Sequence, residues 1–485
     1  MISPVSGGRT PQVATSVGHV VGRLLETPDG AVFAYLGVPF GVVSERFARS
    51  TRPRYRSDPI DAAQFGPIAM QSSTAEHPAH RMSETACLNV NIWNGAPGET
   101  NLPVFVWIHG GLHISGSNGQ PLQRGGRLAA YGRMIVVSVN YRLGALGNLS
   151  LGPLLGDAFV DADNLALLDV IDALRWVKES IANFGGDPDN VTLSGQSAGG
   201  VLVACALASP ESSGLIRRAI IQSANIDRPT QPDATVTDDL LAELGCAHTP
   251  KELLTMPGSR IIAAQESVIA RRSRGQRVPP AVFRPSVDGR HLVHSPAEAI
   301  AQGASAGVDL IVGTNANEAT SFVDITQPDN ESLRRELHAR LQRSEGRSSG
   351  DDPVAAYRKA LSIESGSVPT IAEALERHLS DETYRSPSRR LLQSRRDSLA
   401  ATYGYSFVWA EADHDWARRS GHSLEVPFIF RHIDDSPEAL AELGDHAPSR
   451  LRDDLSSRWV AFAAAGVPGD DWPTFGPDQF TRRFG

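Results

Sequence analysis

Two apolar runs and the helix that follows them constrain the fold of this chain most strongly. Residues 102–108 and 134–140 are almost continuously apolar, as expected for strands buried on both faces of a parallel sheet. Residues 164–183 carry apolar side chains at steps of three and four, the spacing of one buried helical face. Residues 185–188 are predicted to end this helix, and residues 190–194 to form the next strand. This βαβ unit predicts an α/β fold with a large, mostly parallel central sheet flanked by helices.

The pentapeptide at residues 195–199, Gly-Gln-Ser-Ala-Gly, connects the last of these strands to a helix of small residues. On such a turn the serine hydroxyl is exposed at the sheet edge, and the glycines allow a close approach that a Cβ atom would prevent. The N-terminus of the helix favours negative charge that develops beside the serine. The pentapeptide also occurs by chance, but the strand before it and the helix after it favour Ser197 as a nucleophile.

A second glycine turn follows the strand predicted at 102–108. Residues 109–112 read His-Gly-Gly-Leu. A nucleophilic serine needs N–H donors for the oxyanion of the tetrahedral intermediate, and a turn at the end of a neighbouring strand can supply one. A plain glycine turn is the alternative interpretation. The two motifs together, in this order, favour an oxyanion hole.

Composition and charge limit the classes of partner. The net charge of −9 over 485 residues argues against nucleic acid and acidic membrane surfaces as main partners. No secretory leader pattern and no membrane-spanning apolar run is evident. Cys87, Cys205 and Cys246 fit neither a disulfide framework nor a zinc site, and the acidic cluster at 411–415 is interpreted as a solvated turn. We therefore expect a cytoplasmic protein that binds no metal.

Residues 330–396 differ from the rest of the chain because they are charged and helical in pattern, with a Ser/Gly/Asp-rich break at 344–352. A strand-like segment follows at 406–410. We interpret 330–396 as a helical insertion beside the sheet, within a single catalytic domain that spans residues 1–485.

Segments from about residue 20 to the C-terminus match one known family in order. They are residues 35–40, 87–93, 107–116, 139–144, 184–200, 287–289, 313–318, 421–430 and 459–468. On these segments the chain resembles the type-B carboxylesterase family, which includes the cholinesterases and the lipases of that branch. The resemblance implies the α/β-hydrolase fold with helical insertions. It also implies hydrolysis of a small-molecule carboxylic ester without a cofactor, and leaves the oligomeric state open.

The resemblance also supplies the other two members of a catalytic triad. It places the acid at Glu318, in the segment 313–318, and the base at His422, in the segment 421–427. In this interpretation His422 takes the proton of Ser197 and returns it to the leaving alcohol, while Glu318 fixes the imidazole tautomer. Without the family motifs, Glu318 would be read as an exposed loop acid and His422 as a structural histidine.

Further site residues follow from the same resemblance. Ser223 matches a family serine that supports the acid and base, although an ordinary buried serine at a strand end is almost as good an interpretation. The substrate pocket is expected to include His113, Gln196 and Phe322.

The oxyanion segment departs from the family pattern. The third glycine of the usual triplet is Leu112, and His113 follows it where an aromatic residue is common. The N–H groups of Gly111, Leu112 and Ala198 can still form the hole. We predict that the leucine side chain lies at the mouth of the site, where it narrows the space for bulky groups or displaces the donors. Asn148 also differs from the family, because it replaces a common phenylalanine.

Three classes of function remain open at this point. The leading one is a serine carboxylic ester hydrolase that forms an acyl-serine intermediate. The second is a biosynthetic enzyme with a reshaped pocket, such as a lactonase, thioesterase, transacylase or non-hydrolytic cyclase. The third is a catalytically silent binding protein, and the complete triad argues against it.

Overall fold

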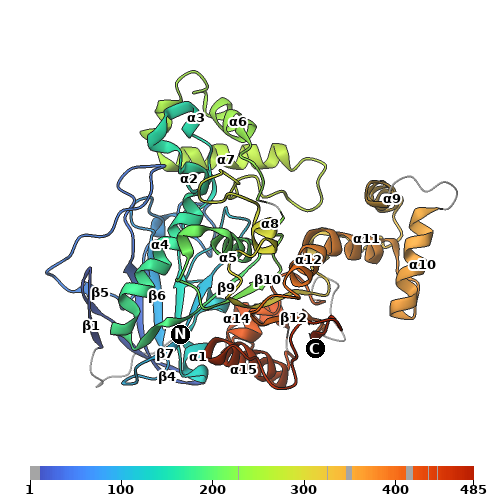
Figure 1. Cartoon of the computed structure of the whole chain (residues 1–485). Helices are drawn as coiled ribbons and strands as arrows, with labels where there is room; N and C mark the ends of the chain where they lie inside the picture. The colour runs from blue at the N-terminus through green and yellow to red at the C-terminus, as the bar shows by residue number, and fades with distance from the viewer. Residues whose placement is uncertain are drawn as a thin grey trace.

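A ten-stranded sheet forms the centre of the molecule (Figure 1). The computed structural model describes residues 11–227, 229–324, 326–345, 352–410, 419–434, 436–444 and 446–485. The strands of the sheet, in spatial order, are β13 (Thr481–Phe484), β12 (Thr402–Phe407), β11 (Asp309–Asn315), β10 (Arg218–Gln222), β9 (Gly186–Gln196), β7 (Leu102–Ile108), β8 (Ile135–Val139), β6 (Asn89–Asn94), β4 (Gly30–Pro39) and β3 (Arg23–Thr27). A separate small sheet contains β1 (Gln12–Thr15), β2 (Gly18–Val21) and β5 (Ile60–Asp61).

The sheet is mixed but mostly parallel, as the sequence predicts. Every pair of neighbours from β13 to β8 is parallel. The pairs β8–β6, β6–β4 and β4–β3 are antiparallel. Because the carboxyl ends of the parallel strands share one edge, the loops that follow β7, β9, β10 and β11 meet there.

Helices cover both faces of the sheet. Along β7, Val104, Val106 and Ile108 join an apolar core with α4 (Leu165–Ser180), α5 (Ala198–Ala208), α8 (Pro296–Ala301) and α12 (Ser386–Ser394). The alternate side chains Phe105 and Trp107 join a second core with α1 (Gly126–Gly132), α13 (Val426–Ile429) and α15 (Ser449–Ala465). Burial on both faces explains why the strand is continuously apolar.

Most of the strand and helix predictions agree with the structure, and their differences have local causes. The helix predicted at 164–183 is α4 with a 3-10 turn after it, η5 (Ile181–Phe184). The turn predicted at 185–188 is wrong beyond Gly185, because β9 already begins at Gly186, which pairs with Leu102. The strand predicted at 406–410 begins earlier, at Thr402, which pairs with Leu310 of β11.

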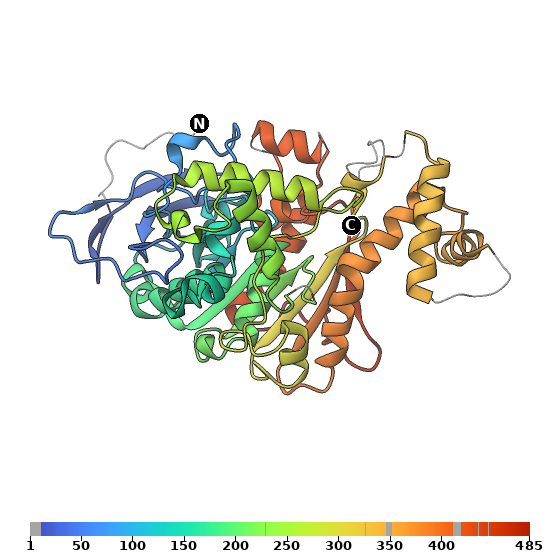
Figure 2. The ribbon, with the colours of Figure 1, turned by 90° about the horizontal axis from the view of Figure 1, so that it is seen from above.

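Helical segments extend beyond the sheet in two places. The helices α2 (Gly144–Gly147), α3 (Gly152–Leu155), α6 (Ala234–Leu244) and α7 (Gly258–Arg272) pack around a third apolar core. Within the segment 330–396 lie α9 (Glu331–Glu345), α10 (Pro353–Ser365), α11 (Ile371–Ser380), the π-helical turn η9 (Asp381–Arg385) and α12. Figures 1 and 2 show α9 and α10 standing away from the sheet, while α12 packs against it. The predicted break at 344–352 lies mostly at 346–351, outside the described residues.

The remaining helix, α14 (Pro437–Leu443), lies between α13 and α15 in sequence. Among the described helices, none combines the length and the apolar character that crossing a membrane requires.

Candidate active site

Ser197 occupies the sharp turn between β9 and α5. β9 ends at Gln196 and α5 begins at Ala198, so Ser197 is the single residue between strand and helix. Its φ of 56° and ψ of −124° lie in a region that L-residues rarely adopt. The turn is held by a 2.9 Å hydrogen bond from Ser197 N–H to the Gln222 carbonyl of β10, and by one of 3.0 Å from Val201 N–H to the Ser197 carbonyl. Strained backbone of this kind persists only where surrounding contacts enforce it, as at functional sites.

The two flanking glycines are required by close packing, as predicted. A Cβ atom on Gly195 would lie 2.6 Å from the carbonyl group of Gly199. A Cβ atom on Gly199 would lie 2.1 Å from the Ile108 carbonyl oxygen at the end of β7. Both contacts are with backbone, which cannot move aside, so neither position accepts a side chain.

Glu318 and His422 meet at the same edge of the sheet. The loop after β11 carries Glu318, whose side chain is fully buried, and the His422 Nδ1–H donates to its Oε2 over 2.6 Å. The other oxygen, Oε1, accepts from the backbone N–H of Asn315 at 2.7 Å. Glu376 of α11 accepts from the backbone N–H of Ala319 at 3.1 Å and thereby anchors the loop. This arrangement fixes the proton on Nδ1 and leaves the lone pair of Nε2 able to accept a proton.

The environment of His422 favours its protonated form. Burial opposes the charge, but the hydrogen bond and negative charge of Glu318, with the charge of Glu425, outweigh it and raise the pKa of His422. The Nε2 atom lies 3.1 Å from Gln196 Nε2, and the hydrogen bonds of the described residues include none between Ser197 Oγ and His422. Gln196, predicted as a pocket residue, therefore contacts His422.

Glu425 is a second buried carboxylate that the sequence analysis missed. Its Oε1 accepts from Gln222 Nε2 at 2.9 Å and its Oε2 from Asn315 Nδ2 at 2.7 Å. Burial and the charge of Glu318 raise the pKa of Glu425. The same Asn315 Nδ2 donates to the Gly421 carbonyl at 2.6 Å, so this network positions the loop that carries His422. In the sequence, the only indication that Glu425 belongs to the site is its position three residues after His422.

The predicted oxyanion segment forms a tight left-handed turn after β7. Gly111, Leu112 and His113 have φ values of 107°, 54° and 61°. The N–H groups of Ile114 and Ser115 close the turn on the Gly111 carbonyl at 2.9 and 3.0 Å. The three predicted donors are the backbone N–H groups of Gly111, Leu112 and Ala198. None of these N–H groups donates a hydrogen bond to another described residue. Three unoccupied donors beside a serine can stabilise a developing oxyanion.

A cavity of about 40 Å³ adjoins Ser197. The described residues that line it are Leu112, His113, Ser197, Ala198, Val201, Ser223, Asn225, Ala281, Arg284, Thr383 and Tyr384. His113 therefore lines the cavity, as predicted, and so does Leu112. Gln196 and Phe322 do not. Phe322 packs instead against the apolar cluster that joins Leu337 of α9 to Leu375 of α11, because the chain turns toward these helices after Ala319.

The sequence profile of the carboxylesterase family matches residues 9–482. The chain belongs to the carboxylesterase family. It is a carboxylic ester hydrolase, and its fold is that of the solved esterases. One solved p-nitrobenzyl esterase superimposes with a TM-score of 0.81 at 30% identity, covering 98% of this chain and 96% of the other.

Other relatives also match over most of their length. The para-nitrobenzyl esterase of Bacillus subtilis is 32% identical over 96% of this chain and 92% of its own length. Human cocaine esterase is 29% identical over 98% of this chain and 87% of its own length. A carboxylesterase of Geobacillus stearothermophilus superimposes with a TM-score of 0.81 at 30% identity, covering 97% of this chain and 96% of the other.

Ser223 is among the residues that line the cavity of the carboxylesterase, but it does not bond to Glu318 or His422. It follows β10 with a φ of 50° and is fully buried. Its Oγ has no hydrogen-bond partner among the described residues. The predicted support of Glu318 and His422 is therefore not present as a hydrogen bond among the described residues.

Two further cavity residues come from the helical segment and were not predicted. Thr383 and Tyr384 belong to the π-helical turn η9 between α11 and α12. The ring of Tyr384 lies 4.7 Å from the imidazole of His422, centroid to centroid. Single π-helical turns are often found at functional sites. No spacing in the sequence indicates such a turn.

Among the described residues, no group of three or more His, Cys, Asp or Glu side chains is placed to hold a metal ion. The acidic cluster at 411–415 lies outside the described residues.

Proposed function

We propose that this carboxylesterase works through an acyl-serine intermediate, with Ser197 as nucleophile, His422 as general base and acid, and Glu318 as the carboxylate that orients His422. The observation that carries the proposal is the 2.6 Å hydrogen bond from His422 to a fully buried Glu318, beside the strained turn of Ser197. A base oriented by a third group beside a nucleophile is the arrangement that activates a serine.

The reaction runs in two halves. Ser197 Oγ attacks the ester carbonyl carbon while its proton passes to His422 Nε2, and the oxyanion accepts hydrogen bonds from Gly111, Leu112 and Ala198. The intermediate collapses as the C–O bond breaks and His422 gives the proton to the alcohol. Water then attacks the acyl-serine by the same path and releases the acid. Gln196 must first release Nε2, since its amide lies 3.1 Å from that atom.

The cavity beside Ser197 favours short acyl groups. A cavity must offer about 10–15 Å³ to hold one water molecule. This cavity of about 40 Å³ therefore has room for about three water molecules. We infer that this cavity takes a short acyl chain rather than a long one. Known relatives are named for different compounds, and one of them is a phenmedipham hydrolase of Pseudarthrobacter oxydans at 28% identity. That Leu112 restricts bulkier groups stays a prediction.

The mechanism can be tested by measuring how the acyl-serine intermediate divides between reaction with water and reaction with methanol. Three esters of one short acid, with p-nitrophenol, phenol and ethanol as leaving groups, would be hydrolysed in dilute methanol. We expect the ratio of methyl ester to free acid to be the same for all three, because each forms the same acyl-serine. Product ratios that vary with the leaving group would contradict the proposal.

The pH dependence follows from the raised pKa of His422. The imidazole must be neutral to accept the serine proton, so kcat/KM falls as pH drops below the His422 pKa, tenfold for each unit. We expect the midpoint of this limb to lie above 6.5, the ordinary value for histidine. Initial rates between pH 5 and 9 measure it. A midpoint at or below 6.5 would show that burial of His422 outweighs the charge of Glu318.

A further inference from the structure

The loop that carries Glu318 is bound from outside the sheet, by α11. Glu376 of this helix accepts hydrogen bonds from the Ala319 N–H at 3.1 Å and from Asn317 Nδ2 at 3.2 Å. Ser380, one turn further along α11, also accepts from the Ala319 N–H, at 3.0 Å, and donates to Glu376 Oε1 at 2.5 Å. Glu318 lies between the two loop residues that Glu376 binds, so these bonds fix the backbone that carries it.

The π-helical turn η9 binds the same loop at its other end. Arg385 donates to the Ala316 carbonyl at 2.8 Å and forms an ion pair with Asp381. Burial lowers the pKa of Arg385 to about 10, which leaves the guanidinium charged at neutral pH. The ring of Tyr384 lies 4.7 Å from the imidazole of His422. The helical segment therefore contacts the loop of the acid and the base itself.

Ala319 also belongs to the apolar core of this helical segment. It is fully buried in a cluster with Leu337 of α9, Val354 of α10 and Leu375 of α11. Figure 1 shows α11 between the sheet and the outlying α9 and α10. Apolar contacts hold the loop against these helices without setting its exact position, because they are not directional. The hydrogen bonds of Glu376 supply that direction.

Glu376 and the loop depend on each other. The side chain of Glu376 is 1% exposed. Burial raises the pKa of Glu376, and the hydrogen bonds that it accepts oppose this only in part. A buried polar group is costly to leave without a partner. Removal of the carboxylate would therefore release both the Asn317 amide and the Ala319 N–H from α11, with Ser380 as the remaining acceptor.

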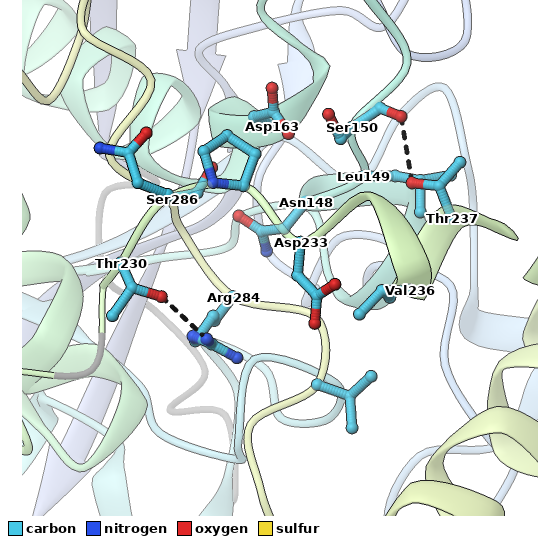
Figure 3. Close-up of a pocket in the computed structure, with 13 residues that line it drawn as sticks. Asn148, Leu149, Ser150, Asp163, Thr230, Asp233, Val236, Thr237, Arg284 and Ser286 are labelled. Carbon is cyan, nitrogen blue, oxygen red and sulfur yellow. Dashed lines mark hydrogen bonds between the residues drawn. The ribbon is translucent and has the colours of Figure 1, made fainter. Parts of the chain in front are cut away.

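The other helical segment beyond the sheet does not contact this loop by hydrogen bonds. α6 borders a cavity of about 30 Å³ (Figure 3), where Thr237 donates to the Ser150 carbonyl at 3.0 Å. Among the described residues, no hydrogen bond of α6 or α7 reaches the loop that carries Glu318. Thr237 is 1% exposed, so it offers a buried helical hydroxyl for comparison with Ser380.

We propose that Glu376 is a positioning residue for catalysis, which together with Ser380 holds Glu318 at the place where it meets His422 Nδ1. The inference rests on the proposed function, because it takes Glu318 as the residue that orients His422. A carboxylate that moves away from the imidazole no longer fixes its tautomer or stabilises the imidazolium. An error of about 1 Å in such a geometry can lower a rate by about 10²-fold.

Glu376→Leu tests the inference with two measurements. We expect kcat for a short p-nitrophenyl ester to fall at least about tenfold and KM to stay within about twofold, because the cavity beside Ser197 is not changed. We also expect the midpoint of the acidic limb of kcat/KM to move down by at least about half a pH unit. The negative charge of Glu318 raises the pKa of His422, so a weaker contact between them lowers it.

The shift of the midpoint reports on Glu318 because the substitution leaves the surrounding ionisable groups in place. Glu425 lies in the loop of His422 and also raises the pKa of His422. The other described ionisable groups around Glu318 and His422 are Tyr384 and Arg385 of η9 and Tyr405 of β12.

The conservative variant is Glu376→Gln. Its side-chain oxygen can accept from Ala319 and Ser380 as the carboxylate does, so kcat should stay within about threefold of wild type and the midpoint should not move. The double variant Asn317→Ala with Ser380→Ala removes two of the bonds between the loop and α11 and decides the question if Glu376→Leu does not fold. It should lower kcat at least about threefold and move the midpoint down.

Thr237→Val is the matched control. It removes the buried hydrogen bond that Figure 3 shows between Thr237 and Ser150, and it should leave kcat and the midpoint unchanged. Thermal unfolding followed by circular dichroism shows which variants are folded. An equal change in Thr237→Val and in the α11 variants would mean that general loss of stability, and not the position of Glu318, lowers the rate.

Three further results overturn the inference. They are wild-type kcat in Glu376→Leu, a lower kcat with an unmoved midpoint, and equal losses in Glu376→Gln and Glu376→Leu, which would assign the effect to charge. Glu318→Gln, measured beside them, separates failure of the proposed function. Wild-type kcat in Glu318→Gln would remove the role of Glu318 itself, whereas a large loss there with wild-type behaviour in Glu376→Leu would remove only the role of Glu376.

Discussion

Replacing Ser197 by alanine is expected to lower kcat for a short p-nitrophenyl ester by about 10⁵- to 10⁶-fold. The variant keeps the oxyanion donors and the cavity but has no atom that can form the acyl intermediate. The remaining rate should match direct attack by water, assisted by the oxyanion hole. Steady-state kinetics with highly purified protein measures it, with circular dichroism to confirm the fold.

The matched controls for this variant are chosen from the same chain. Ser213→Ala changes an exposed serine just after α5 and should leave kcat unchanged. The double variant of Ser197→Ala and His422→Ala should be no slower than Ser197→Ala, because a base without its nucleophile has nothing to activate. A Ser197→Ala rate within about tenfold of wild type would exclude Ser197 as the nucleophile.

Replacing Glu318 by glutamine is expected to lower kcat by about 10⁴-fold with little change in the fold. The glutamine amide can donate to His422 Nδ1, which moves the imidazole proton to Nε2 and leaves no lone pair to accept the proton of Ser197. The loss of the negative charge also removes the stabilisation of the imidazolium that the 2.6 Å hydrogen bond provides.

Glu425→Gln is the matched control for Glu318→Gln. Glu425 is equally buried, but it bonds to Gln222 and Asn315 rather than to the imidazole. We expect its replacement to lower kcat by less than about tenfold. Equal losses in the two variants would mean that general damage to the buried carboxylate network, and not the tautomer of His422, controls the rate.

The parts of the fold that depend on local pattern could be predicted from the sequence. Residues 102–108 form β7 with the predicted bounds, because a strand buried on both faces must be apolar throughout. The turn at Ser197 could be predicted because its glycines are required by backbone contacts as close as 2.1 Å. The placement of Glu318 and His422 came from the family motifs, since both lie in loops without a periodic pattern.

The cavity could not be predicted, because its wall combines segments that are far apart in the sequence. Arg284 lies in a loop before α8, while Tyr384 lies in the π-helical turn after α11. Only their positions in three dimensions bring them to Ser197. Phe322 was expected in the pocket from the family resemblance, but it packs against the cluster that includes Leu337 and Leu375. Gln196 contacts His422 from the end of β9, directly before Ser197.

The most direct test of the central claim is the site of covalent labelling by a fluorophosphonate. The purified protein would be inactivated with the probe and digested, and the modified peptide identified by mass spectrometry. The account predicts one label for each chain, on Ser197, formed in parallel with the loss of ester hydrolysis. A label on another residue with Ser197 unmodified, or full ester hydrolysis after Ser197 is labelled, would contradict it.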